Sequence, residues 1–277
     1  AKMKKNKELD IRDEQVMQLE ILRQFINLCK CENIQYFAGY GTLLGAVREQ
    51  KFIEWDDDID LWIKREDVCK LENVFDNYFD KSKYFLQTYK SDPSCLSPEM
   101  LRICINNTFK WDENIGKESF HTGIYFDIFP LDYGYSDKRD EEYLTEFTKR
   151  HMKLYSNLKC KWLKLSLKEK VKYIKYHLKS RKYLSKKVRE IADLYANNSK
   201  SSIYVCVPTS YFGYERCCFD TELFSNSVNL QFEDMEISCP IGYHRLLIQL
   251  YGEDYMIPKV TKEERHKAFV IEEDEYR

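Results

Sequence analysis

The chain has 277 residues, of which 43% are hydrophobic and 15% aromatic, which supports a large core and excludes a disordered chain, a collagen or a coiled coil. No apolar run approaches the roughly 18 residues of a membrane-spanning helix. The net charge of −2 conceals a division, because residues 149–190 hold 16 of the 44 basic residues and two of the 46 acidic ones. That segment carries +14 and the remainder −16, which predicts two surfaces with different partners.

The spacing of apolar residues predicts an α+β fold, with a mixed sheet in the first half followed by a helical insertion. The predicted helices span 13–31 (with Val16, Leu19, Leu22, Ile26 and Cys29 on one face), 42–48, 65–79, several segments up to about 197, and 243–251. The predicted strands span 34–38, 57–63, 84–89, 101–105, 123–129 (ended by Pro130) and 202–207, before a turn at Cys239–Pro240.

An acidic run lies where the second strand is predicted. Asp58 and Asp60 alternate there with Ile59 and Leu61, so the two carboxylates point to one face, about 7 Å apart along the strand. Such carboxylates repel each other unless a cation lies between them. An oxygen-only site with two negative charges selects Mg²⁺ or Mn²⁺, usually with a phosphate as a further ligand. A solvated acidic turn is the alternative, but Trp55 and the apolar neighbours favour burial.

A glycine-rich turn precedes the acidic strand. Gly41 allows backbone N–H groups to approach a phosphate, Thr42 is placed to cap the following helix, and Arg48 is a candidate donor to phosphate oxygens. A strand, glycines, a helix and then the Asp-x-Asp pair, in this order, are typical of the nucleotidyltransferase (polymerase-β-like) fold. That fold adds a third carboxylate from a later strand.

The same residues show a closer resemblance. The runs that carry it are Gly41-Thr42-Leu43-Leu44-Gly45-Ala46-Val47-Arg48, Phe52-Ile53 and Trp55-Asp56-Asp57-Asp58-Ile59-Asp60, followed by Phe126-Asp127-Ile128-Phe129-Pro130-Leu131-Asp132 and Tyr251-Gly252. These runs resemble the LicD family, bacterial phosphocholine and polyol-phosphate transferases related to fukutin and fukutin-related protein. The chain departs from the usual basic loop of the family at Glu49, Gln50 and Glu54, which leaves the donor head group open.

The resemblance implies a metal-dependent phosphotransferase that uses a CDP-linked donor such as CDP-choline, CDP-ribitol or CDP-glycerol. Asp58 and Asp60 would hold Mg²⁺ or Mn²⁺, while Gly41, Thr42 and Arg48 would bind the donor diphosphate. The acceptor would be a hydroxyl of a glycan or lipid-linked glycan of the cell surface, such as teichoic acid, capsule or lipopolysaccharide, and CMP would leave. Two alternatives stay open: a nucleotidyltransferase that releases pyrophosphate, and a non-catalytic glycan-binding or membrane-docking protein. The Asp58/Asp60 pair disfavours the second.

Further site residues follow from polar positions in apolar surroundings. Asp127 lies in the predicted strand 123–129 and is the candidate third metal ligand or general base, with a cap of the turn before Pro130 as the alternative. Arg102 is predicted to balance the donor diphosphate, unless it forms a surface ion pair. Weaker candidates are Asp57, Glu233, Asp254 and His266.

Together these features predict a catalytic core at 1–135, a basic helical insertion at 136–200, and a C-terminal α+β segment at 201–277 that completes the active site. The basic segment 149–190 is expected to be an ordinary helical surface or one that meets an anionic membrane or an anionic glycan. Its apolar stripes include Leu167/Val171/Ile174/Leu178 and Leu184/Val188/Ile191. No nucleic-acid partner is expected.

The ten cysteines show no disulfide framework. A zinc site built from Cys206, Cys217, Cys218 and Cys239 is conceivable, but structural zinc usually uses closely paired ligands. Because no apolar stretch follows the basic N-terminal residues, we expect no signal peptide. Reduced, packed thiols are therefore expected, in a cytoplasmic protein that is peripheral at the inner face of the membrane.

Overall fold

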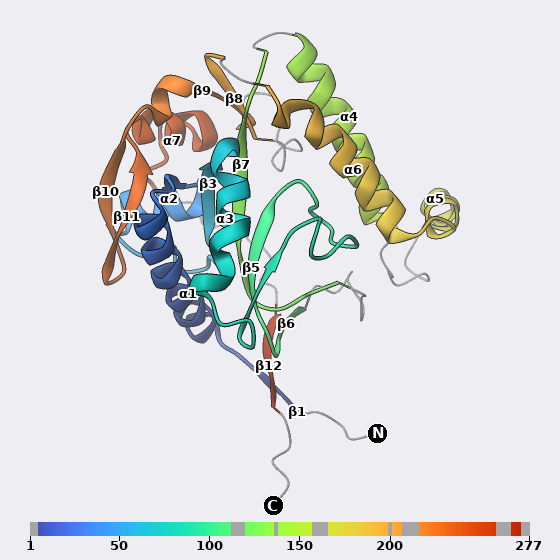
Figure 1. Cartoon of the computed structure of the whole chain (residues 1–277), viewed down its shortest axis with the longest axis horizontal. Coiled ribbons are helices and arrows are strands. Elements are labelled where there is room, and N and C mark those ends of the chain that lie inside the picture. The colour runs from blue at the N-terminus through green and yellow to red at the C-terminus, as the bar shows by residue number, and fades with distance from the viewer. Residues whose placement is uncertain are drawn as a thin grey trace, which may run out of the picture.

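A mixed β-sheet forms the centre of the molecule, with helices packed around it (Figure 1). The computed structural model describes residues 5–111, 120–135, 138–156, 166–198, 201–206, 216–258 and 267–272. The central strands in spatial order are β4 (Tyr84–Gln87), β5 (Leu101–Ile105), β7 (Tyr125–Tyr133), β3 (Asp60–Lys64) and β2 (Tyr36–Ala38). β3 and β7 are parallel, whereas the other neighbours are antiparallel. The predicted α+β fold with a mixed sheet is confirmed.

Two later strands extend this sheet, β8 (Ile203–Val205), which pairs with the end of β7, and β9 (Cys218–Asp220) beside β8. The hairpin of β10 (Ser227–Phe232) and β11 (Met235–Pro240) forms a two-stranded sheet of its own. A separate three-stranded sheet has the order β1 (Lys5–Glu8), β12 (Lys267–Glu272) and β6 (Thr108–Trp111). The first and last described strands are therefore paired with each other.

Seven helices lie in the described ranges, at the positions that the apolar spacing predicts. They are α1 (Ile11–Glu32), α2 (Tyr40–Arg48), α3 (Arg65–Tyr78), α4 (Lys138–Tyr155), α5 (Leu167–His177), α6 (Arg181–Ala196) and α7 (Tyr243–Tyr251). α3 packs on β3 and β7, α2 packs on β3 and α7, and α4 and α6 pack on each other. None of these helices is both long and apolar enough to cross a bilayer.

The hydrophobic core surrounds the central sheet. Trp62 of β3 is fully buried, and its ring meets those of Tyr40, Phe219 and Phe224 at centroid distances of 4.8 to 5.5 Å. A second cluster lies between α4 and α6, where the predicted apolar stripe of Leu184, Val188 and Ile191 is buried. Apolar core residues thus pack against both faces of β3, whose first residue, Asp60, is the last residue of the acidic run.

Several predicted strand limits differ from the structure, and backbone contacts explain two of these differences. β3 begins at Asp60 rather than at 57, because the carbonyls of Asp56 and Asp57 accept hydrogen bonds from side chains of α1 instead of from a neighbouring strand. β7 continues through Pro130, which was expected to end it. The first residue of β5 pairs with Ile128, so Pro130 lies beyond the part of β7 that β5 covers, and its missing N–H removes no ladder bond.

Other differences concern faces and turns. Val16, predicted on the buried face of the first helix, is 52% exposed, whereas Gln15 and Gln18 are buried. The Cys239–Pro240 pair ends β11 instead of forming a turn. Strands β1, β6, β9, β10, β11 and β12 were not predicted.

Candidate active site

A row of charged side chains crosses three neighbouring strands. Asp60 of β3 lies opposite Asp127 of β7, and Asp127 lies opposite Arg102 of β5. Residues opposite each other in a sheet point to the same face. Arg102 donates to both Asp127 oxygens, from Nε at 2.6 Å and from a terminal nitrogen at 3.1 Å, and its guanidinium lies 4.1 Å from the ring centroid of Tyr125. The structure therefore brings together three residues that the sequence could place only in separate strands.

Asp60 lies at the most strongly repulsive point of this row. Its side chain is partly exposed, yet the surrounding protein desolvates the carboxylate, and this burial raises its pKa well above the ordinary value. The nearby charges of Asp58, Asp127 and Asp56 raise that pKa further, whereas Arg102 opposes them. A position that is open to solvent and short of positive charge favours a bound cation.

Asp56 joins this group, although the sequence did not single it out. Burial, the charge of Asp58 and a hydrogen bond with Asp58 raise the pKa of Asp56 to about 8. A Cβ atom on Gly41 would lie 2.5 Å from a carboxylate oxygen of Asp56. Gly41 is therefore required for the close approach of this carboxylate to α2, a reason that the sequence alone did not indicate.

The loop that contains Asp56, Asp57 and Asp58, here called the acidic loop, is held by hydrogen bonds from polar side chains of α1. Gln15 donates to the carbonyl of Asp56 at 2.9 Å, and Gln18 donates to the carbonyl of Asp57 at 2.9 Å. Gln18 also donates to the carbonyl of Tyr125 at 2.9 Å. Because Gln18 is fully buried and these are backbone contacts, α1 sets the position of the loop independently of the charges on it.

A buried lysine also holds the acidic loop. Lys110 of β6 donates to the Asp57 carbonyl at 2.7 Å and lies 3.0 Å from the carboxylate of Glu14, which is fully buried. Its Nζ is also 3.5 Å from the Asp57 carboxylate. Burial lowers the pKa of Lys110, but the charges of Tyr125, Asp57 and Glu14 raise it by more. Asp57 thus contacts the structural ion pair of Lys110 and Glu14.

The other predicted donor-binding residues have structural partners. Thr42 lies inside α2 rather than at its cap, which is Gly39, and its Oγ1 accepts a hydrogen bond from the Asp60 N–H at 2.9 Å. Arg48 donates to Glu49 at 2.9 Å and to the Tyr255 carbonyl at 3.2 Å. The predicted cap is therefore wrong, and Thr42 instead positions the first residue of β3.

Of the weaker candidates, Glu233 has structural partners of its own. Glu233 forms an ion pair with Arg12 at 2.8 Å and accepts from the Phe52 N–H at 3.3 Å, which ties the β10–β11 turn to α1. Asp254 is exposed in the turn after α7. His266 lies outside the described residues.

Tyr251 at the end of α7 was quoted in the family motif but was not predicted as a site residue. Burial raises the pKa of its hydroxyl, and so do the charges of Asp60, Asp56 and Asp58. Its side chain is 36% exposed. Tyr251 therefore borders the carboxylates while remaining open to solvent, as a residue that contacts a ligand would.

The four cysteines of the conceivable zinc site are divided between two core clusters. Cys206 and Cys239 belong to the cluster around the central sheet, and Cys217 and Cys218 belong to the cluster beside α4 and α6. Burial raises the pKa of Cys239 to about 12, which disfavours the thiolate that zinc requires. Within the described ranges, no three His, Cys, Asp or Glu side chains converge closely enough to form a complete metal-binding set.

The donor set nevertheless suits a hard divalent cation. Mg²⁺ commonly binds through one or two carboxylates and obtains its other ligands from waters and substrate phosphates. Asp58 and Asp60 provide two mutually repelling carboxylates at an accessible edge, whereas the bidentate contact with Arg102 engages Asp127. The residues present thus fit an incomplete protein site that a phosphate ligand would complete.

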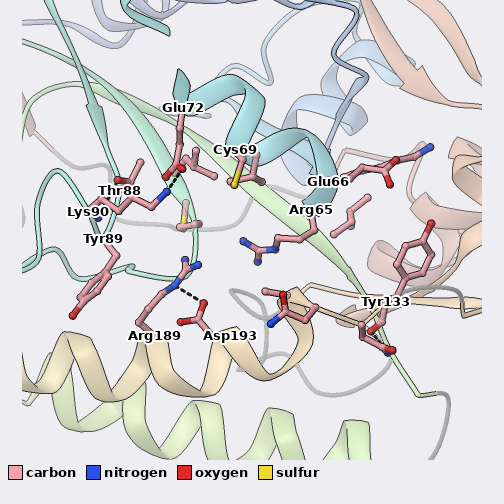
Figure 2. Close-up of a pocket in the computed structure, with 18 residues that line it drawn as sticks. Arg65, Glu66, Cys69, Glu72, Thr88, Tyr89, Lys90, Tyr133, Arg189 and Asp193 are labelled. Atoms are coloured by element: carbon pink, nitrogen blue, oxygen red, sulfur yellow. Dashed lines mark hydrogen bonds and ion pairs between the residues drawn. The ribbon is translucent and has the colours of Figure 1, made fainter. Parts of the chain in front are cut away.

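The carboxylates are not in the large cavity that Figure 2 shows. This cavity of about 680 Å³ lies between the start of α3 and α6, and Arg65, Lys90, Tyr133 and Arg189 are among the residues that line it. None of the predicted site residues in the described part of the chain lines it. Charge and strand register, not the size of a cavity, therefore mark the candidate active site.

Comparisons with known proteins identify the family to which this chain belongs. The family described as LicD/FKTN/FKRP, nucleotidyltransferase domain, matches residues 33–151, which contain Asp58, Asp60, Arg102 and Asp127. The lipopolysaccharide cholinephosphotransferase LicD of Haemophilus influenzae is 30% identical over 274 residues, 96% of this chain and 98% of that protein. An uncharacterized protein of Rickettsia prowazekii is 37% identical over 59 residues, 21% of this chain and 22% of that protein. Since the similarity to the Haemophilus influenzae protein spans nearly the whole of both chains, this chain belongs to the LicD family.

Proposed function

We propose that this chain transfers phosphocholine from a CDP-linked donor to a hydroxyl group of a cell-surface glycan and releases CMP. Membership in the family makes the chain a LicD-type phosphotransferase. The choice of phosphocholine and of a glycan acceptor is supported by the cholinephosphotransferase that matches nearly the whole chain. Ribitol phosphate and glycerol phosphate are the alternative groups for transfer.

The observation that carries the proposal is the row Asp60–Asp127–Arg102 beside the acidic loop. Phosphoryl transfer depends on positioning and on neutralising charge at the phosphorus and its oxygens. We therefore assign the described core to a nucleotidyltransferase-like catalytic fold, in which β3 and β7 present the carboxylates and Arg102 lies at their side. The residues 201–277 contribute Tyr251 at the border of the same group.

Asp58 and Asp60 are the proposed ligands of a Mg²⁺ or Mn²⁺ ion. When bound, such an ion supplies positive charge that polarises phosphoryl oxygens. Asp127, held by Arg102, is the proposed general base and accepts the proton of the acceptor hydroxyl. The acceptor oxygen then forms the new bond to the phosphorus that carries choline. The bond from this phosphorus to the CMP oxygen breaks, and CMP leaves with the electron pair.

The test is incubation of the protein with CDP-choline labelled in the choline methyl groups, Mg²⁺ and a glycan acceptor. Label in the glycan together with CMP in solution is the expected result. Release of labelled phosphocholine, with the nucleotide on the glycan, would instead establish nucleotidyl transfer. A panel with CDP-ribitol and CDP-glycerol ranks the head groups, and a faster reaction with either of them would replace phosphocholine in the proposal.

Mg²⁺ should stabilise the protein more at pH 8 than at pH 5. The pKa of Asp56 is raised to about 8 and that of Asp60 is also raised, so the folded state holds more protons than the unfolded state above about pH 4. Their stabilising contribution is complete below about pH 4 and falls as the pH rises through the folded pKa values. Mg²⁺ offsets the repulsion only where the carboxylates are ionised.

Thermal unfolding with and without Mg²⁺ at the two pH values measures this difference. A concentration about 100 times the dissociation constant should add about 2.7 kcal/mol to the free energy of unfolding. Asp60→Asn should lose the effect, whereas Asp76→Asn on the exposed side of α3 should retain it. Equal stabilisation at both pH values, or in the Asp60→Asn variant, would contradict the assigned ligands.

We further propose that the protein works on the cytoplasmic side of the membrane. Cys29, Cys95, Cys104 and Cys239 are buried, and desolvation raises the pKa of each thiol. Thiols packed in this way are typical of proteins in a reducing compartment. We expect the CDP-linked donor, on which the proposed reaction depends, in the same compartment.

A further inference from the structure

Helix α5 exposes a continuous apolar stripe. Leu167, Val171, Ile174 and Leu178 are 85%, 62%, 52% and 83% exposed. Their spacing of four, three and four residues places them on one face of the helix and its C-terminal cap. α5 has no buried residue among its eleven. The sequence predicted this stripe as an apolar face, but the structure does not bury it.

The orientation of α5 directs this stripe away from the protein. Tyr176, on the opposite side of the helix, packs against the core cluster beside α4 and α6. Tyr173 lies on that side as well and is half-buried. In Figure 1, α5 lies at the outer end of the α4–α6 pair, remote from the central sheet. The helix is therefore attached through its tyrosines and presents its apolar side outwards.

Lysines border the stripe. At 100° per residue, Lys168 and Lys175 lie on one side of it and Lys170 lies on the other. Glu169, the one acidic residue of α5, forms a capping box with Ser166, in which its carboxylate accepts from the Ser166 N–H at 2.8 Å. Exposed basic residues continue beyond the helix at Lys179 and Lys182. The apolar stripe is thus surrounded by positive charge.

We propose that α5 docks this chain on an anionic lipid bilayer, with the apolar stripe inserted between lipids and the lysines at the head groups. An amphipathic helix of this composition lies in the interface rather than across the membrane. The lysines favour anionic lipid and would repel the same face of a second copy. A soluble polyanion would satisfy the lysines but would leave the stripe exposed to water.

The same segment contains no equivalent surface on α6. Leu184, Val188 and Ile191 have the same spacing within a basic sequence, yet all three are buried in the core. Within the described part of 149–190, the predicted membrane surface is therefore assigned to α5 and the lysines beside it. The docking assignment is independent of the proposed transfer reaction, since it rests on exposure and charge alone.

The test is cosedimentation of the full chain with vesicles of phosphatidylcholine and phosphatidylglycerol, beside vesicles of phosphatidylcholine alone. Binding to the anionic vesicles is expected, and it should weaken as salt is added. A variant with Leu167→Gln, Val171→Gln, Ile174→Gln and Leu178→Gln should bind about tenfold more weakly or not at all. A matched variant with Met152→Gln and Leu194→Gln, both exposed elsewhere on the helices, should bind normally.

All four stripe residues are exposed, so unchanged circular dichroism and unfolding temperature are expected and separate loss of binding from loss of folding. Equal binding to both vesicle types, undiminished binding of the four-glutamine variant, or no binding by the wild type would overturn the proposal. So would dimers that the four glutamines dissociate, measured by sedimentation velocity without lipid. Because the readout is binding, a failure here is distinct from a failure to transfer phosphocholine.

Discussion

Replacing Asp60 with Asn is expected to abolish phosphotransfer while stabilising the fold. The substitution keeps the shape of the side chain and the hydrogen bond from the Asp60 N–H to Thr42, but it removes the charge that Asp58, Asp127 and Asp56 repel. Loss of about 4 kcal/mol of transition-state stabilisation corresponds to about a thousandfold slower transfer. Relief of about 1 kcal/mol of repulsion would raise Tm by about 2–4 °C in a chain of this size.

Both quantities are measured on the same preparation, transfer as CMP released and stability by calorimetry at pH 8. Asp76→Asn is the matched control, since Asp76 is exposed and forms a surface ion pair with Lys81. Activity that survives in Asp60→Asn would remove the metal-ligand assignment. A lower Tm without Mg²⁺ would show that Asp60 is stabilising as an anion, contrary to the repulsion described.

Arg102→Met is expected to produce the largest loss of stability among the site variants. It leaves Asp127, whose side chain is 10% exposed, without its bidentate partner and next to further negative charges. Removal of one member of a buried ion pair destabilises a protein by about 3–5 kcal/mol. Because Arg102 is partly exposed, we expect its replacement to lower the free energy of unfolding by about 3 kcal/mol, the lower end of this range.

A double variant separates the pair from the other contacts. Asp127→Asn together with Arg102→Met should recover much of the lost stability, because no uncompensated carboxylate remains. Arg245→Met is the control, since Arg245 and Asp220 form an exposed ion pair at 3.0 Å that is expected to contribute less than about 1 kcal/mol. Denaturant unfolding of the wild type, Arg102→Met, the double variant and Arg245→Met measures the free energy of unfolding of each. Equal losses for Arg102→Met and the double variant would show that Asp127 does not depend on the arginine.

Local patterns predicted the elements that carry the site but not the way in which they meet. The apolar spacing located β5 and α7 at their observed limits. The alignment of Asp60, Asp127 and Arg102 depends on the pairing of β3, β7 and β5, whose partner residues belong to separate strands far apart in the sequence. The spacing of apolar residues within one strand does not determine its register with another strand.

Buried polar residues explain other differences. Glu14 and Gln18 share a helical face with Leu22 and Phe25, so their spacing indicates polar groups directed into the protein. This signal was available and was missed in favour of Val16. The loop carbonyls that Gln18 and its neighbour Gln15 bind are tertiary contacts, and they determine that the acidic run is a loop as far as Ile59.

The unpredicted hairpin β10–β11 has a different cause. Its turn contains Glu233 with φ of 57°, in the left-handed region that usually favours Gly or Asn. Ion pairs from Arg12 to Glu233 and from Arg23 to Asp234 hold this turn against α1. The conformation is thus supported by contacts more than 200 residues away in sequence, which a search for local turn residues cannot detect.

The pairing of β12 with β1 and β6 bears on when the site is completed during folding. β12 joins Val270 to Lys7 on one side and to Thr108 on the other, and β6 carries the lysine that supports the acidic loop. β12 follows the strands of the central sheet in sequence, and contacts between such distant segments form slowly. The central sheet can therefore form before β12 pairs with β6, but the support for Asp57 becomes complete only with that pairing.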